Sequence, residues 1–371
     1  MFAMLIKLFF SVRLTSFPEP NRACPSGPIF SRFVPDGEAD AVYLTADGAP
    51  HEIRVWFARS AKLQGGLLTW HLKGTEFDPT LMRRQGKLDA GWLFGKMNMP
   101  VSDSEFAALQ HSPKATPEEF GDVTEDADYV ALAKRLIRTL QPRLAAFVST
   151  LRCQYGQYWL EAPRPWDSRS ETLGAYCSGQ LQLRWWYEEK KAWYWFLPTR
   201  CGFSMVCQIL PQSHFDQYLT EADWRRLQGT RCLDDVPTEM QLLANADKSL
   251  DSGDYRQAFV EVCSALELTI SGRLASENDV IKRAISSFLD GETRKAHVAV
   301  VLLLIGASEH EIQNTLKAVE IRNRVVHDGY IPGESDGRIL REVVQAIRKI
   351  GNFAEIKSPT LDSGTNMLFT P

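Results

Sequence analysis

A cation, an amide and an imidazole lie close together near the C-terminal end of the chain. The stretch IRNRVVHDGY, residues 321–330, contains Arg322, Asn323 and His327. Arginine is permanently charged and can hold a phosphate through parallel hydrogen bonds. Imidazole titrates near neutral pH, so it can take up or release a proton, and an asparagine can orient either partner. These three side chains could therefore bind a phosphate ester and move a proton beside it.

The same residues also have an explanation without catalysis. The dipole of a helix favours a histidine at its C-terminal end, which would account for His327. Arg322 could cap the end of a helical bundle, and Glu320 and Arg324 have the four-residue spacing of a surface ion pair. From the sequence alone, both explanations stay open.

One amphipathic helix is predicted to carry these residues. Ser308 and Glu311 have the spacing of a capping box at the start of a helix, and Gly329 can supply the left-handed residue that ends it. The apolar stripe predicted for this helix consists of Ile312, Leu316, Val319, Asn323 and Val326. Asn323 is thus expected on the buried stripe, where an amide needs hydrogen-bond partners.

The chain after residue 235 is predicted to be helical throughout. Helices are expected at 254–275, at 278–290 and at 338–350, and the apolar run 298–305 should form the most buried helix. Short loops separate these segments, as in a small helical bundle.

The arrangement of Arg322, Asn323 and His327 at the end of the penultimate helix resembles the HEPN family, the higher-eukaryote and prokaryote nucleotide-binding domains. The resemblance covers residues 236–356 and implies an all-α bundle that acts as a homodimer with a composite site. It implies RNA as the substrate, cleaved without metal or cofactor by attack of the 2′-hydroxyl, with Arg322, Asn323 and His327 as the catalytic residues. The products would be a cyclic phosphate and a 5′-hydroxyl.

Some HEPN proteins carry a His-x-Tyr sequence whose tyrosine receives nucleotides. Here Tyr330 is the third residue after His327, so that regulation is not expected. The family also implies a setting in antiphage defence or a toxin–antitoxin pair.

The N-terminal residues 1–230 predict a mixed, β-rich α+β domain, which makes the whole chain α+β. Short strands are expected at 41–46, 51–58 and 67–74, and residues 1–10 read as a buried strand because Lys7 interrupts the apolar run. A helix is expected at 128–151, with a kink or a break at Pro142. We expect this domain to sense or bind a ligand or a regulatory partner.

An aromatic hairpin is predicted at 181–199, where two strands meet across EEKK. Its tryptophans, with nearby Arg184, Lys190 and Lys191, could stack on nucleic-acid bases. A cross-strand aromatic ladder packed on the core explains the same pattern and is the favoured interpretation.

Composition excludes several other classes of protein. The net charge of -4 does not suit general nucleic-acid binding, and seven scattered cysteines without a CxxC pair favour a reducing cytoplasm. The histidines do not have metal-ligand spacing, and the run 298–305 is too short to cross a bilayer. The leading hypothesis is a metal-independent endoribonuclease; the alternative is a non-enzymatic dimerisation or adaptor protein.

Overall fold

The computed structural model describes residues 4–13, 29–31, 33, 37–45, 51–56, 88–90, 92–111, 127–161, 181–196, 219–229, 236–276, 294–304, 306–351 and 353. The chain divides into two compact units. Within the described residues, one unit contains the strands and the first helices, and the other contains Leu151–Trp159 together with the residues from Val236 on. No described helix combines the length and the apolar composition that a bilayer span requires.

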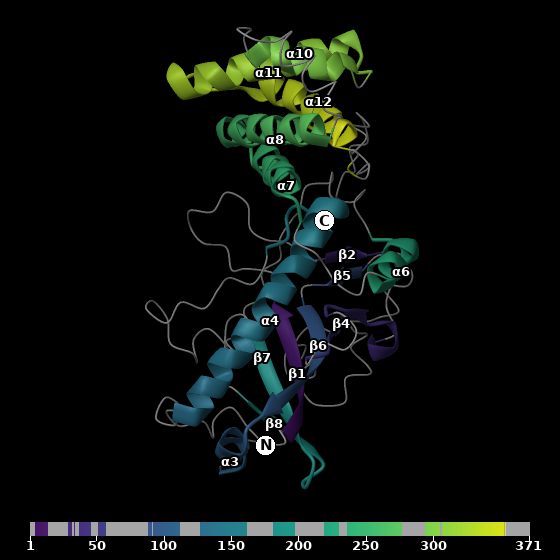
Figure 1. Ribbon diagram of the computed structural model, residues 1–371, viewed down its shortest axis with the longest axis vertical. Coiled ribbons are helices and arrows are strands. Elements are labelled where there is room, and N and C mark those ends of the chain that lie inside the picture. The colour runs from purple at the N-terminus through teal and green to yellow at the C-terminus, as the bar shows by residue number, and fades with distance from the viewer. Residues whose placement is uncertain are drawn as a thin grey trace, which may run out of the picture. The chain divides into compact units, whose positions relative to one another are not determined.

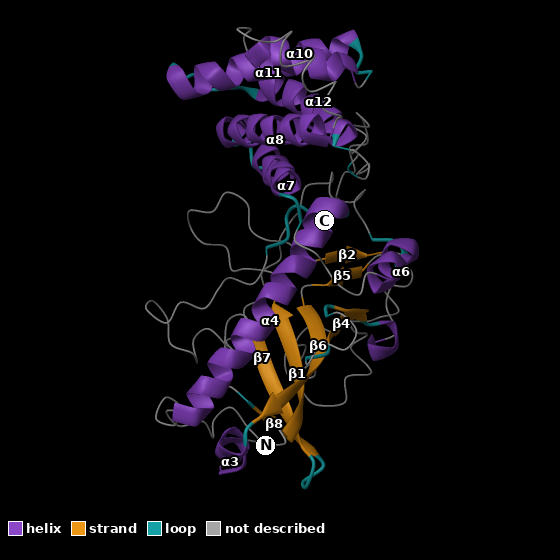
Figure 2. Cartoon of the chain, in the orientation of Figure 1, coloured by secondary structure: helices purple, strands orange, loops and turns teal. Residues whose placement is uncertain are grey.

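The first unit is built on an antiparallel sheet of six strands (Figures 1 and 2). In sheet order the strands are β3 (Val42–Tyr43), β4 (Ile53–Trp56), β6 (Trp92–Val101), β1 (Met4–Arg13), β7 (Leu181–Tyr187) and β8 (Ala192–Trp195). β1 pairs with β6 along its whole length, from Met4 opposite Val101 to Arg13 opposite Trp92. The expected N-terminal strand and the expected hairpin at EEKK are therefore confirmed, whereas β6 was not anticipated.

The two faces of this sheet differ in their side chains. One face carries Leu8, Phe10 and Val12 of β1, all fully buried, and Gly95 of β6, where an added Cβ would clash with the ring of Phe10. On the opposite face, Lys7 of β1 is exposed. Phe9 and Ser11 of β1 lie on this second face and are buried, so this face is covered in part as well.

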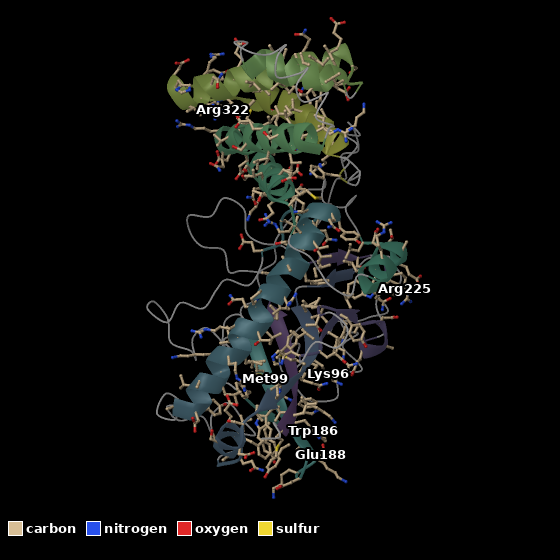
Figure 3. The ribbon with its side chains drawn as sticks, viewed as in Figure 1. Lys96, Met99, Trp186, Glu188, Arg225 and Arg322 are labelled. Atoms are coloured by element: carbon tan, nitrogen blue, oxygen red, sulfur yellow. The ribbon has the colours of Figure 1, made fainter. Side chains whose placement is uncertain are left out.

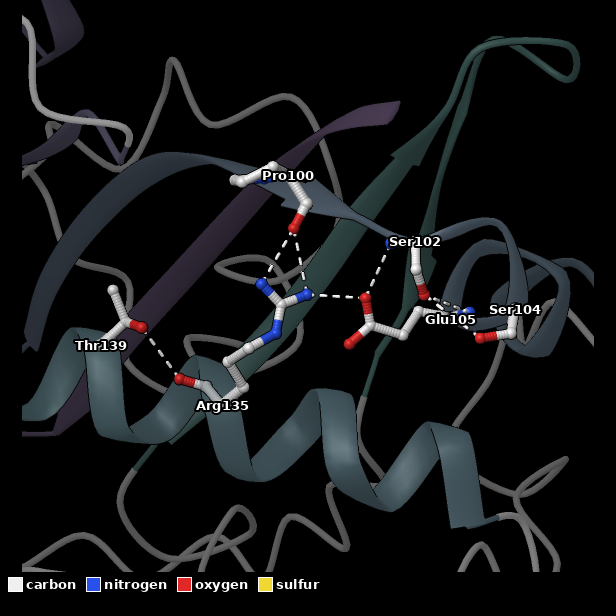
Figure 4. Close-up of polar contacts among 6 residues, drawn as sticks. All are labelled: Pro100, Ser102, Ser104, Glu105, Arg135 and Thr139. Atoms are coloured by element: carbon white, nitrogen blue, oxygen red, sulfur yellow. Dashed lines mark hydrogen bonds and ion pairs between the residues drawn. The ribbon is translucent and has the colours of Figure 1, made fainter. Parts of the chain in front are cut away.

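Two helices cover the apolar face, α3 (Asp103–His111) and α4 (Ala127–Gln154). The ring of Phe106 on α3 packs edge-on against Trp185 of β7, with centroids 6.3 Å apart. Arg135 of α4 fastens the corner where β6 leads into α3: its two terminal nitrogens donate to the carbonyl of Pro100, and one also donates to Glu105 at 2.7 Å (Figure 4).

α4 runs without interruption through Pro142, so the break considered from the sequence does not occur. The exposed position of Pro142 is consistent with this, because the ring lies at the surface of the helix. The predicted strand at 67–74 lies outside the described residues.

Smaller elements complete this unit. A second sheet pairs β2 (Ile29–Ser31) with β5 (Leu88–Ala90), and a short 3₁₀ helix, η1, spans Gly37–Asp40. α6 (Glu221–Gly229) is held to η1 because the indole of Trp224 donates to the carbonyl of Asp40 at 2.7 Å and Arg225 pairs with the Asp40 carboxylate at 2.6 Å.

The second unit is a helical bundle. Its helices are α7 (Thr238–Asp251), α8 (Tyr255–Ser276), α10 (Arg294–Leu304), α11 (Glu309–His327) and α12 (Glu334–Ile350). One core cluster joins all five, with Phe259, Leu302, Leu340 and Ile347 fully buried. The helix expected at 278–290 lies outside the described residues.

α10 is not the most buried helix, contrary to the prediction from its uniformly apolar sequence. Val301 and Leu302 are buried, but Leu303 and Leu304 are each 63% exposed. Among the described residues the bundle covers the side of α10 that carries Val301 and Leu302, and Leu303 and Leu304 lie at the surface.

Two ion pairs tie the ends of the bundle together. Arg348 of α12 pairs with Asp247 of α7, and Arg341 of α12 lies 3.3 Å from Asp251 at the end of α7. The hydroxyl of Tyr158 donates to the same Asp251 carboxylate. Burial, together with the Asp251 carboxylate, raises the pKa of Tyr158 well above its usual range, so the phenol stays a donor. The segment Leu151–Trp159 thus belongs to the bundle by its contacts as well as by its position.

Candidate active site at the end of α11

The helix that carries Arg322, Asn323 and His327 begins and ends as the sequence predicted. Ser308 accepts a hydrogen bond from the backbone N–H of Glu311, and the Glu311 carboxylate accepts one from the backbone N–H of Ser308 at 2.7 Å. At the other end, Gly329 has a φ of +67°, which only glycine adopts without strain. The backbone N–H of Tyr330 donates to the carbonyl of Arg324, so the last turn is closed. The positions of the candidate residues are therefore set by two well-formed caps.

The buried face of α11 matches the expected stripe only in part: Ile312 is buried and Leu316 and Val319 pack partly buried against the core. Its buried residues are Ile312, Thr315, Ala318, Ile321 and Val325, whereas Asn323 and Val326 are exposed. The placement of Asn323 on the buried stripe was wrong. The small residue Ala318 lets α8 approach closely, and the thiol of Cys263 on α8 lies 3.9 Å from the Ala318 carbonyl.

Arg322 lies at the edge of the buried face and is partly buried (Figure 3). Its Nη1 donates to the side-chain oxygen of Asn323 at 3.1 Å. Its Nε is buried and has no hydrogen-bond partner within the described residues. An unsatisfied buried donor costs free energy, and such groups recur where a ligand completes the bonding. Within the described residues, Nη1 of Arg322 therefore donates to Asn323, whereas its Nε has no acceptor.

His327 is the last residue of α11 and is exposed. It follows Arg322 by five residues, so the two side chains project from successive turns at different angles. Within the described part of the chain, no hydrogen bond joins Arg322 to His327. The three predicted residues therefore occupy one end of one helix, but a single copy of the chain does not assemble them round a common point.

The loop after α11 is fixed by Tyr330. The guanidinium of Arg324 lies over the Tyr330 ring, 3.9 Å from its centroid, and the Tyr330 hydroxyl donates to Asp336 at 3.0 Å. The Asp336 carboxylate raises the pKa of the phenol. Tyr330 therefore has a structural task in joining α11 to α12, in keeping with its departure from the His-x-Tyr spacing.

Exposed apolar side chains flank the candidate residues. Val326 is 48% exposed, and Ile331 in the following loop is 80% exposed. The sequence analysis missed Ile331 because a single apolar residue before a proline carries no periodic signal. An apolar patch beside two cationic or titratable groups is typical of a surface that is covered in an assembly.

Groups of carboxylates, histidines or cysteines able to hold a metal ion do not occur among the described residues. Comparison of the chain with models of known protein families, with curated proteins and with solved structures found no match in any of the three. What the site does must therefore be argued from its own residues.

Proposed function

We propose that the chain is an endoribonuclease of the HEPN type whose active site forms from the α11 ends of two copies. The observation that carries this proposal is the grouping of Arg322, Asn323 and His327 at an exposed helix end, where the buried Nε of Arg322 has no hydrogen-bond partner among the described residues. In the proposal the N-terminal unit, with its sheet, senses or binds the signal or partner that regulates cleavage.

Assembly of two copies is what the site requires. Val326 and Ile331 offer apolar surface that a second copy would bury. In a two-fold interface the same surface of both copies forms the contact. A two-fold axis near the end of α11 would therefore bring two arginines and two histidines round one cleft. A single chain supplies one imidazole, and two chains supply both an acid and a base.

The chemistry assigned to each residue follows from its type. One His327 would remove the proton from the 2′-hydroxyl, whose oxygen then attacks the adjacent phosphorus. The His327 of the second copy would donate a proton to the departing 5′-oxygen, leaving a 2′,3′-cyclic phosphate. Arg322 would hold the non-bridging oxygens as negative charge accumulates on them, and Asn323 would orient its guanidinium.

The alternative is a dimerisation or adaptor module without catalysis. The observation that favours it is that Arg322 donates a hydrogen bond to its neighbour Asn323, which would suit a surface arginine held for protein contact. Both functions use the exposed apolar residues Val326 and Ile331, so only a measurement of RNA cleavage distinguishes them.

The deciding experiment compares cleavage of total RNA by the wild type, His327→Ala and His310→Ala. His310 is the matched control: it is an exposed histidine at the opposite end of α11, paired with Glu342 at 2.9 Å. We expect His327→Ala to lose about 10²–10⁴-fold in rate, and His310→Ala to cleave like the wild type. If all three proteins cleave RNA equally, or if none does, the proposed active site is wrong and the bundle acts as an adaptor.

A further inference from the structure

The sheet of the first unit has a second face that the proposed function does not use. Cross-strand partners lie on the same face of a sheet, so the strand register groups its side chains into rows. One row runs across five strands and consists of Tyr43, Arg54, Lys96, Phe9 and Arg184. Four spacings between strands give this row a length of about 19 Å.

A second row lies beside the first on the same face. Asn98 pairs with Lys7, and Trp186 pairs with Trp193. Leu8 pairs with Trp185 across two antiparallel strands. The neighbouring residues Lys7 and Trp186 therefore also lie opposite each other, and both project to the other face of the sheet. Cations and aromatic rings are therefore mixed on this face, which is opposite the one that α3 and α4 cover. Phe9 is buried within it, with its ring centroid 6.1 Å from that of Trp193.

Solvent reaches the groups that could bind a ligand. Lys7 is exposed, Trp186 and Trp193 are partly exposed, and the Lys96 side chain is 33% exposed. The two indoles stand edge to face with centroids 5.4 Å apart. The Trp186 indole N–H donates to Glu188 in the hairpin turn, which fixes its ring (Figure 3). By contrast Trp185, on the other face, is buried as the ladder interpretation required.

Two of the cations already hold an anion in common. The carboxylate of Glu38 on η1 pairs with Arg54 at 2.6 Å and also with Lys96. The two donors are thus spaced to share one oxyanion, as they would share a phosphate. Glu38 also offsets part of the positive charge of this face.

We propose that this face binds single-stranded RNA, with Trp186 and Trp193 stacking on bases while Lys7, Lys96 and Arg54 contact phosphates. Aromatic platforms interleaved with cations are how sheets hold unpaired strands, because every base offers a flat ring and every linkage a negative charge. The choice of RNA as the polynucleotide rests on the proposed function. A phosphate of the bound RNA would compete with Glu38 for Arg54 and Lys96.

The test measures binding of a fluorescent 2′-O-methyl oligouridine to the full chain by anisotropy, over a series of salt concentrations. The blocked 2′-oxygen prevents cleavage by the proposed mechanism, so binding is measured separately from activity. Variants are Lys7→Gln, Trp186→Leu and Glu38→Gln, with Arg143→Gln as the control, since Arg143 is an exposed cation on α4.

We expect Lys7→Gln to reduce the slope of log affinity against log salt by about 0.7, the contribution of one phosphate contact on a single strand. Trp186→Leu should weaken binding about 5- to 150-fold and leave that slope unchanged. Glu38→Gln should bind more tightly than the wild type, a gain that a misfolded protein could not show. Arg143→Gln should bind as the wild type does.

Failure of this proposal and failure of the proposed function give different results. If wild type and all variants bind the oligouridine equally or not at all, the RNA-binding surface is overturned. That result leaves cleavage through His327 standing. If the variants behave as expected while His327→Ala still cleaves RNA like the wild type, the surface stands and the proposed active site falls.

Discussion

The ion pair between Arg348 and Asp247 should be the most sensitive polar contact in the bundle. Their side chains are 7% and 16% exposed, and they join α12 to α7. Replacing Arg348→Met keeps a long side chain but leaves the Asp247 carboxylate without its counter-charge. Removing one partner of a buried pair costs about 3–5 kcal/mol. Because Asp247 keeps some contact with solvent, we expect the lower end, about 3 kcal/mol.

The loss of stability in Arg348→Met should become smaller as the pH falls. Burial raises the pKa of Asp247 above its usual value, while the charge of Arg348 acts to lower it. A raised folded-state pKa means that the carboxyl favours folding in its protonated form, and that this contribution disappears as pH rises through the pKa. Without Arg348 the pKa rises further. The deficit should therefore be largest at neutral pH and shrink on acidification, and adding Asp247→Asn should recover much of it at neutral pH.

Hydrogen–deuterium exchange of peptides from α7 and α12 measures this loss in the unit concerned. A deficit of about 3 kcal/mol corresponds to roughly 150-fold faster exchange at neutral pH. Arg338→Met is the matched control: Arg338 lies on the same helix, and its side chain is 74% exposed in a pair with Glu334. An exposed pair of this kind contributes at most about 1 kcal/mol. Equal protection in Arg348→Met and Arg338→Met, or a deficit that grows on acidification, would refute the reasoning.

Two further expectations concern α11 and its surroundings. Ser308→Ala removes the capping box and should destabilise the first turn of α11 by about 1 kcal/mol, seen as faster exchange there; unchanged exchange would mean that the cap is not used in solution. Ile331→Asp should convert a homodimer to a monomer in light scattering, whereas Leu268→Asp, at a 42% exposed position on α8, should not. A dimer that survives Ile331→Asp would place the interface elsewhere.

Local signals in the sequence predicted the ends of α11 and the strands of the hairpin. The capping box and Gly329 act within a few residues of one another, so their pattern suffices. β6 was missed because Gly95 and Pro100 within it argue against a strand, and because Leu93, Phe94 and Gly95 are buried in succession, although Met97, Met99 and Val101 do alternate with less buried residues.

Contacts between segments far apart in the sequence determine the buried face of α11 and the pairing of Arg348 with Asp247, so local patterns could not predict them. α11 carries two apolar stripes, one through Leu316 and Val319 and one through Thr315 and Ala318. Its own pattern favoured the larger residues. These pack partly buried against the core, whereas the smaller ones are buried where α8 packs closely. Arg348 and Asp247 are 101 residues apart, and neither carries a local sign of its partner.

The central claim is that two copies of His327 and Arg322 cleave RNA by attack of the 2′-hydroxyl. The most direct measurement determines the ends of the RNA fragments produced by the purified full-length chain in the presence of EDTA. The account predicts 2′,3′-cyclic phosphate and 5′-hydroxyl ends, formed at an undiminished rate and absent with His327→Ala. Fragments with 3′-hydroxyl and 5′-phosphate ends, or cleavage that EDTA abolishes and magnesium restores, would contradict it.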